Sequence, residues 1–305
     1  MKKFLKNISI FCLPIALLLI VLPTNDQLRY EGLEGDCSDR GSWIYNRLYM
    51  DTGLIDVLFL GSSHTINGVE DAILERSSEK GKRFVNMGYC RLGRDLSYAL
   101  LKEVVTNKKP SKVIVEIRES ENRYSHPIFP FVAQTKDVLL AEPILNRDYL
   151  SNIWEHIFYK VDLTQDFLYQ VKDTNHVEFR STGFPPWVDT STLVVSGTEF
   201  EGKSESEPLW QQQIFDRFSK SYLQRISALC VERDIDLFFL YLPSFHPRQT
   251  RPTNLEWYEK YGELLFPPDS LQTSPLYRHD VDHFNHKGAE ILSNWLSEKL
   301  EKKEK

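Results

Sequence analysis

Short apolar runs recur along the chain and predict the strands of a buried parallel sheet. They cover residues 55–60, 83–87, 113–117 and 237–242. Runs of this length suit strands that are covered on both faces. Apolar residues recur at helical spacing in three further segments, over residues 93–107, 210–233 and 287–300. Strands that alternate with helices in this way predict an α/β fold with helices on both faces of the sheet.

The N-terminal residues 1–23 predict a membrane anchor. Lys2, Lys3 and Lys6 precede an apolar run over residues 8–22. Positive charge ahead of such a run keeps the N-terminus in the cytoplasm and places the rest of the chain across the membrane. The run is shorter than the ~20 residues of a comfortable spanning helix, so a cleaved signal peptide is the alternative. No small-x-small cleavage site comes after it, which favours a single-pass anchor in a bacterial inner membrane with a periplasmic body.

The rest of the chain divides into a linker and one domain. Residues 24–50 are polar and Gly/Asp-rich, and we expect a linker there. Residues 51–305 form the domain, with an inserted helical and irregular segment at about 120–209 that includes a helix over 146–173. The insertion is rich in aromatic residues, which we expect to form its own small core, with stacking on sugar rings as the alternative. They include Trp154, Phe158, Tyr159, Phe167, Phe184 and Trp187.

Charge and cysteine content narrow the classes of partner. The chain has 305 residues and a net charge of −6, which argues against nucleic acid because phosphate binding needs a concentrated basic surface. Cys12 belongs to the anchor, which leaves Cys37, Cys90 and Cys230 in the body. We expect buried free thiols, with one disulfide among the three as the alternative in an exported domain.

Candidate chemistry lies at two junctions between strand and helix. Gly61-Ser62-Ser63-His64-Thr65 comes directly after the first strand, where a tight turn can present a hydroxyl at the mouth of the sheet. A serine hydroxyl needs a neighbouring base to become nucleophilic. Asp280 stands three residues ahead of His283, just before the last helix, so that its carboxylate can orient the imidazole. The two loops can meet above the sheet although they lie far apart in sequence.

These two motifs resemble those of the SGNH (GDSL-type) hydrolase superfamily. The matching patterns are Gly61-x-Ser63 and Asp280-x-x-His283-x-Asn285-x-x-Gly288. The resemblance is closest to the membrane-anchored branch that includes D-alanyl transfer and alginate O-acetylation proteins. It implies a three-layer α/β/α sandwich in which Ser63 is the nucleophile, His283 the general base and Asp280 its orienter.

The same resemblance implies a function. The protein is expected to be a serine esterase or O-acyltransferase that acts on acyl esters, acetyl above all, of a cell-envelope or exported polysaccharide. It needs no cofactor, and its expected partners are the acylated glycan and a multispanning membrane acyltransferase.

Two other blocks depart from the family pattern. Arg91 stands where the family usually has glycine, so its backbone N–H and that of Ser63 are the candidate oxyanion donors, while its side chain either crowds the site or serves a charged substrate. The asparagine usual after the third strand is out of register, which leaves Arg118 and Asn122 as candidate substrate contacts. Loss of one oxyanion donor costs about 100-fold or more in rate. The alternative is therefore a weak or inactive module that binds glycan or the partner acyltransferase.

Simpler interpretations stand beside these roles. Ser62, Ser63 and Thr65 could cap the helix after the strand. Glu116, Arg118 and Glu119 are expected by default to be ordinary surface charges at a strand end.

The histidines near the C-terminus offer a rival zinc chemistry. His279, His283 and His286, with Asp280 and Asp282, are ligand types for zinc. The sequence of this segment predicts a loop rather than a helix, and we therefore expect no metal site.

Overall fold

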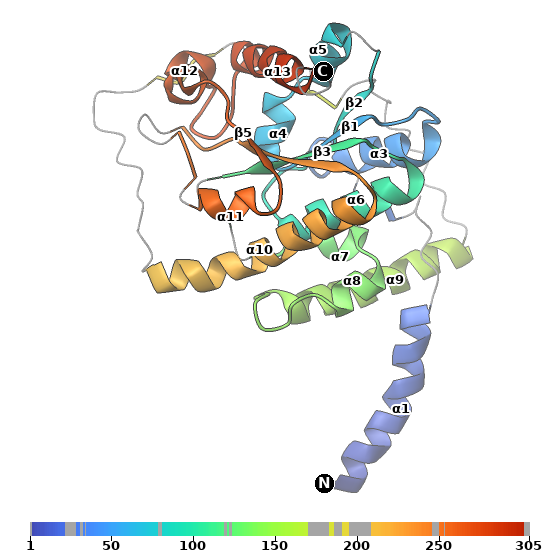
Figure 1. The fold of residues 1–305 in the computed structure, drawn as a ribbon. Coiled ribbons are helices and arrows are strands. Elements are labelled where there is room, and N and C mark those ends of the chain that lie inside the picture. The colour runs from blue at the N-terminus through green and yellow to red at the C-terminus, as the bar shows by residue number, and fades with distance from the viewer. Residues whose placement is uncertain are drawn as a thin grey trace.

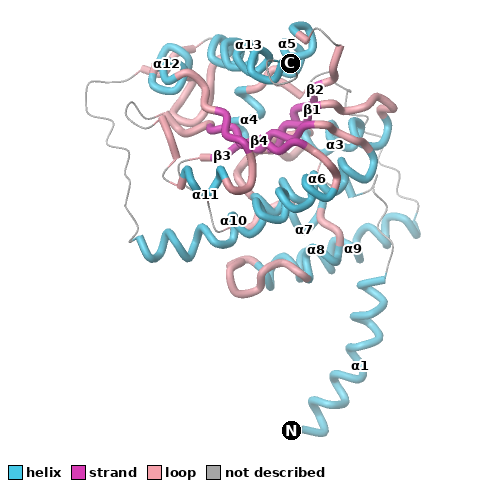
Figure 2. Tube along the Cα trace, viewed as in Figure 1, coloured by secondary structure: helices cyan, strands magenta, loops and turns pink. Residues whose placement is uncertain are grey.

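A five-stranded parallel sheet forms the centre of the protein, in the order β2-β1-β3-β4-β5 (Figures 1 and 2). The strands are β1 Val57–Leu60, β2 Phe84–Asn86, β3 Lys112–Ile117, β4 Asp236–Tyr241 and β5 Glu263–Leu265. This computed structural model describes residues 2–21, 29–30, 33, 35–78, 81–118, 121, 124–169, 183–185, 191–194, 209–245, 250–252 and 254–301.

Helices cover both faces of the sheet, which gives three layers (Figure 1). One face carries α4 Ser63–Gly68, α5 Asp71–Ser77, α12 Asp269–Thr273, the short η2 Pro275–Tyr277 and α13 His286–Glu301. The other face carries α3 Arg40–Tyr45, η1 Asn46–Met50, α6 Arg94–Asn107, α10 Leu209–Glu232 and α11 Leu255–Glu259. The predicted α/β class is confirmed.

Alternate residues of each strand pack against opposite layers. In β1, Val57 and Phe59 join the apolar cluster under α13, whereas Leu58 and Leu60 join the cluster under α6 and α10. Successive side chains of a strand point to opposite faces. A strand buried on both faces is therefore mostly apolar, which is why the short continuous runs predicted the strands.

The stretch expected to be a linker is part of the core. Tyr30, Trp43, Ile44 and Leu48 are all buried and belong to the same cluster as α6. The interpretation of residues 24–50 as a linker is therefore wrong for residues 29–30, 33 and 40–48, which pack against the body of the protein. Their polar neighbours obscured the signal, because a few large apolar side chains without a clear period are enough to dock a segment.

The N-terminal helix α1, Lys2–Val21, contacts α9 and leads away from the body (Figure 1). Within the described residues, no helix meets the length and apolarity needed to cross a membrane.

The insertion forms a helical group below the α6–α10 layer in Figure 1. It consists of α7 Phe129–Val132, α8 Thr135–Leu139 and α9 Tyr149–Tyr169. The predicted helix over 146–173 corresponds to α9. The expectation that the aromatic residues form the insertion's own core is wrong for Trp154 and Phe158, which are exposed. Phe184 is buried, but its ring lies near His286 of α13, whereas Tyr159 packs edge-on against Phe131 within the insertion. Trp187 and the side chain of Phe167 lie outside the described residues.

One disulfide ties the N-terminal segment to the loop after β2. Cys37 and Cys90 are bonded across 53 residues of sequence, and Cys230 is a buried free thiol. The expectation of free thiols throughout the body is therefore wrong for one pair, and the alternative of one disulfide is correct. Sequence could not choose the pair, because pairing depends on which loops the fold brings together.

Replacing Cys37 and Cys90 together by serine is expected to lower the free energy of unfolding by about 2–4 kcal/mol, because the unfolded chain regains the freedom of a long loop. Chemical denaturation of the full chain measures this change. A reducing agent should destabilise the wild type by a similar amount and leave the double variant unchanged. Equal stability of wild type and variant under oxidising conditions would contradict the prediction.

Candidate active site

Ser63 lies at the carboxyl end of β1, at the first position of α4. Gly61 makes the turn between them, and an added Cβ there would collide with the hydroxyl of Thr65 and the carboxylate of Glu116. Ser62 is the N-cap of α4, since its hydroxyl accepts a hydrogen bond of 3.1 Å from the His64 backbone N–H. Ser62 therefore caps α4, and the hydroxyl of Ser63 takes no part in this cap.

The structure brings Ser63, His283 and Asp280 into one hydrogen-bonded chain. The Oγ of Ser63 lies 2.8 Å from Nε2 of His283, and Nδ1 of His283 lies 2.9 Å from Oδ2 of Asp280. Because a carboxylate only accepts, Nδ1 carries the proton and Nε2 accepts the hydrogen bond of the serine. This is the order of groups that a serine nucleophile with a histidine base requires.

Asp280 is held ionised by its hydrogen bonds. Partial burial alone would raise the pKa of this carboxyl group, but hydrogen bonds from the His283 ring and from the backbone N–H groups of His283 and Asp282 hold the pKa below its ordinary value. The same backbone bonds shape the loop before α13 around Asp280. A charged Asp280 in contact with the ring can stabilise a positive charge on His283.

A second histidine and aspartate lie beside the first pair. His64 is buried, and its Nδ1 donates to the carbonyl oxygen of Leu242 at 2.9 Å. Its Nε2 lies 3.6 Å from Oδ1 of Asp282, which is an ion-pair distance rather than a hydrogen bond. Asp282 also accepts a hydrogen bond of 2.7 Å from Ser244. The neighbouring His64 and this hydrogen bond hold the pKa of Asp282 well below its usual range.

This second pair connects the turn that carries Ser63 with the loop that carries His283. The ring of His64 packs edge-on against the ring of His283, with their centroids 5.7 Å apart. His64 belongs to α4, next to Ser63, and Asp282 belongs to the loop of His283. The contact therefore joins the turn of Ser63 to the loop of His283, and sequence reasoning did not single out His64.

A buried carboxylate under the turn fixes the position of Ser63. Glu116, only 1% exposed, accepts hydrogen bonds of 2.7 and 2.8 Å from the backbone N–H and the hydroxyl of Ser62. It also accepts bonds of 3.2 and 2.7 Å from the N–H and the hydroxyl of Thr65. The residues that flank Ser63 in the turn are thus tied to one side chain of β3.

Arg118 neutralises this carboxylate. Its Nε donates to Glu116 at 2.8 Å, and its NH2 group donates to the hydroxyl of Ser62. Burial alone would raise the pKa of Glu116, but the charges of Arg118 and His64 and the bond from Thr65 hold the pKa well below its ordinary range. The default expectation of ordinary surface charges is wrong for Glu116, which is buried. The sequence did not reveal this because the partners of Glu116 lie on a turn far away in the chain. Arg118 is partly buried, and Glu119 lies outside the described residues.

Two backbone N–H groups are the candidate oxyanion donors. Ser63 begins α4, so its backbone N–H has no carbonyl partner within the helix. Arg91 comes directly after the disulfide in a left-handed conformation with φ of 70°, and its side chain pairs with Asp36 at 2.6 Å. That ion pair gives the Arg91 side chain a partner away from the serine. The role of the Arg91 N–H as an oxyanion donor stays a prediction, and Asn122 lies outside the described residues.

Asn86 anchors the loop that holds Arg91 to the turn that carries Ser63. Its side-chain amide donates to the carbonyl oxygens of Thr65 and Val69 at 2.9 and 2.8 Å, and its Oδ1 accepts from Gly88 N–H at 3.0 Å. The backbone N–H of Tyr89 donates to Gly61 O at 2.9 Å. The ends of β1 and β2 therefore form one rigid unit.

The other histidines near the C-terminus are spread apart. His279 contacts the hydroxyl of Ser191 at 2.6 Å, and His286 begins α13. In the part of the chain that the structure describes, no group of three His, Cys, Asp or Glu side chains is arranged to hold a metal ion.

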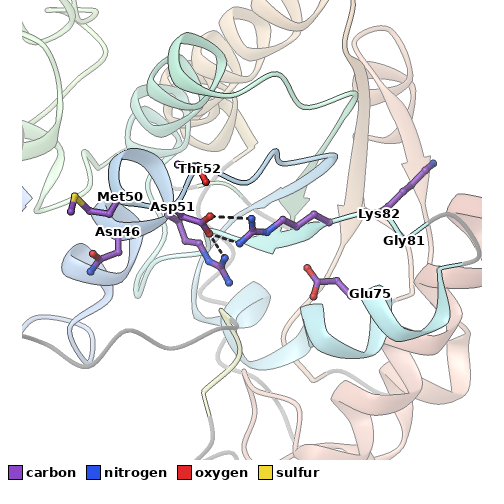
Figure 3. Close-up of a pocket in the computed structure, with 9 residues that line it drawn as sticks. Asn46, Met50, Asp51, Thr52, Glu75, Gly81 and Lys82 are labelled. Carbon is purple, nitrogen blue, oxygen red and sulfur yellow. Dashed lines mark hydrogen bonds and ion pairs between the residues drawn. The ribbon is translucent and has the colours of Figure 1, made fainter.

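A cavity of about 820 Å³ opens at the opposite end of the sheet (Figure 3). Its lining includes Asp51 and Arg83, which stand just ahead of β1 and β2, and Asp51 pairs with Arg47 at 2.6 Å and with Arg83. Because Ser63 stands at the carboxyl end of β1, this cavity is separate from the Ser63–His283–Asp280 chain.

Comparison with models of known protein families finds no match to this chain, and comparison with curated proteins finds none either. The functional argument therefore depends on the geometry of the site and on the sequence motifs.

Replacing Glu116 by glutamine is expected to lower the free energy of unfolding by about 3–5 kcal/mol, because it leaves buried donors and Arg118 without their charged partner. Glu103→Gln is the matched control, since Glu103 of α6 forms a buried pair with Arg29 at 2.5 Å and makes no contact with the turn over residues 62–65. Both variants should lose stability in chemical denaturation, but only Glu116→Gln should also slow the reaction of Ser63 with a serine-directed probe. Equal reactivity of the two variants would contradict a positioning role for Glu116.

The stability that Glu116 contributes should depend on pH. Its pKa is lowered from an ordinary value of 4.5, so the ionised group stabilises the folded state fully above that pH and progressively less as the pH falls below it. The stability difference between wild type and Glu116→Gln should therefore be constant near neutral pH and shrink below about pH 4.5. Denaturation curves collected across this range give the measurement. A difference that does not shrink in acid would rule the linkage out.

Proposed function

We propose that the protein is a serine-dependent acyl-transfer enzyme of the SGNH type. The observation that carries this proposal is the hydrogen-bonded chain from Ser63 through His283 to Asp280 at the carboxyl end of the sheet. Structural serine side chains have no need of a histidine that is itself oriented by a carboxylate. The family resemblance of the two motifs supports the same class.

More narrowly, we propose an esterase or O-acyltransferase that acts on acyl esters, acetyl above all, of a cell-envelope or exported polysaccharide. The Cys37–Cys90 disulfide supports an exported domain, since such bonds persist in oxidising compartments. Lys2, Lys3 and Lys6 ahead of the apolar run support an anchor in the inner membrane with the body outside the cytoplasm. A multispanning acyltransferase as partner rests on the family resemblance alone.

In the proposed reaction, Ser63 attacks the carbonyl carbon of the ester while His283 Nε2 takes the hydroxyl proton. Asp280 stabilises the imidazolium that results. The imidazolium then gives its proton to the departing alcohol, which leaves the acyl group on Ser63. Water or a sugar hydroxyl attacks this ester and passes a proton to His283. The imidazolium returns that proton to Ser63 Oγ as the bond to the acyl group breaks, which restores the starting site. The choice between hydrolysis and transfer depends on how far bound substrate excludes water.

A fluorophosphonate probe tests the activated serine. The full chain should be labelled at Ser63, identified by peptide mass spectrometry, and Ser63→Ala and His283→Ala should abolish labelling. Asp280→Asn should slow turnover of an acetyl ester by about 10⁴-fold, as the loss of the orienting carboxylate does in other triads.

Asp282→Asn is the matched control, because it changes the neighbouring carboxylate and leaves the Asp280–His283 bond in place. It should cost far less activity than Asp280→Asn. A folded wild-type protein that takes up no probe and releases no acetate would sink the enzyme proposal and favour a binding module of the same fold.

A further inference from the structure

Helix α9 buries polar side chains and exposes apolar ones, which is the reverse of an ordinary surface helix. Asn152, His156 and Lys160 are buried against the body, whereas Leu150 and Trp154 are 78% and 65% exposed. A helix on the surface of a soluble protein turns its apolar stripe toward the core and its polar stripe toward water. The arrangement in α9 therefore calls for an apolar environment outside the protein.

The polar side of α9 is docked by specific hydrogen bonds. Asn152 donates to the hydroxyl of Ser125 at 2.8 Å, and Lys160 donates to the hydroxyl of Thr135 at 3.0 Å. His156 donates from Nδ1 to the carbonyl oxygen of Pro130 at 2.6 Å, and its Nε2 lies 2.9 Å from the hydroxyl of Thr135. Buried polar groups are costly unless they are paired in this way. These bonds fix the rotation of the helix, so its apolar side must face outward.

The outward residues form one continuous stripe. Leu150, Trp154, Phe158 and Val161 are spaced three or four residues apart along the helix and are all exposed, and we call them the outer face of α9. The rings of Trp154 and Phe158 contact each other with centroids 4.3 Å apart. The segment between α8 and α9 adds Ile144, which is 93% exposed. A contiguous apolar surface of this kind marks a site of interaction with a membrane or a partner.

A second apolar surface lies next to α9. Helix α1 contacts α9 and extends from the same end of the molecule (Figure 1). Its own exposed side chains include Phe4, Phe11 and Leu13. Two neighbouring elements at one end of the protein thus present apolar side chains to the outside.

We infer that the outer face of α9 lies in the headgroup–acyl boundary of a lipid bilayer, beside α1. An amphipathic helix that lies in the membrane plane buries an apolar face at this depth, and aromatic residues are enriched there. Leu150 and Val161 flank the two rings with aliphatic groups, which suits acyl chains better than the hydroxyls of a glycan. The neighbouring apolar surface of α1 favours a bilayer over a soluble partner. This inference rests on the proposed membrane location and is independent of the esterase chemistry.

Lipid contact can be measured by fluorescence quenching in the full chain. The background variant is Cys12→Ser, in which the remaining free thiol is Cys230, whose burial raises its pKa to about 12 and protects it from labelling. Single cysteines at Trp154→Cys and Phe158→Cys carry a small fluorophore, in vesicles of phosphatidylethanolamine and phosphatidylglycerol that contain a spin-labelled lipid. Glu290→Cys, exposed on α13 across the sheet, is the matched control. Leu13→Cys reports insertion of α1.

Quenching at positions 154 and 158 that is several-fold stronger than at position 290 would support the inference. Quenching at position 13 without quenching at 154 and 158 would overturn it while leaving the membrane location intact, and would mean that a protein or a glycan covers the outer face. An absence of quenching at all four positions would overturn both the inference and the proposed location.

Discussion

The carboxylate of Glu116 is the interaction on which the rest of the candidate site depends. It sits inside β3, yet it accepts the backbone and side-chain donors of the turn after β1. A buried charge without partners would destabilise the fold by several kcal/mol. The turn must therefore close on Glu116 in one conformation, and that conformation places Ser63 at the start of α4. Arg118 completes the arrangement by supplying the opposite charge.

The site is assembled from two units that meet across the end of the sheet. One unit contains Ser63 and is held by Glu116 and Asn86. The other is the loop before α13, which carries both Asp280 and His283 and is held by its own backbone hydrogen bonds. The His64–Asp282 pair spans the junction between them. Fold and chemistry are thus linked, because the contacts that join the layers also set the distance from Ser63 to His283.

Sequence patterns predicted most of the sheet and the three residues of the hydrogen-bonded chain. Continuous apolar runs identify buried strands, and a serine and an aspartate–histidine pair at strand–helix junctions are recognisable because both groups are local. The pattern did not predict β5, because its short apolar run is followed directly by Pro267 and Pro268 and resembles a loop. Glu116 was taken for a surface charge, since the donors that satisfy it come from the turn after a different strand. Tyr30 and Trp43 dock a segment that looks like a linker, because isolated large side chains leave no periodic signal.

The absence of a side chain at Gly61 has a consequence for how the site can change shape. Thr65 and Glu116 fill the space that a Cβ would need, so Ser63 is locked to the sheet and cannot shift independently of it. Asp280 and Asp282, on the facing loop, are partly open to solvent and are held by bonds within the loop and by contacts to His64 and Ser244. Any change in the distance between Ser63 and His283 must therefore come from movement of the loop that carries His283. Ser63 keeps its position on the sheet, and a bound ligand can change the alignment of Ser63 and His283 only by moving the loop before α13.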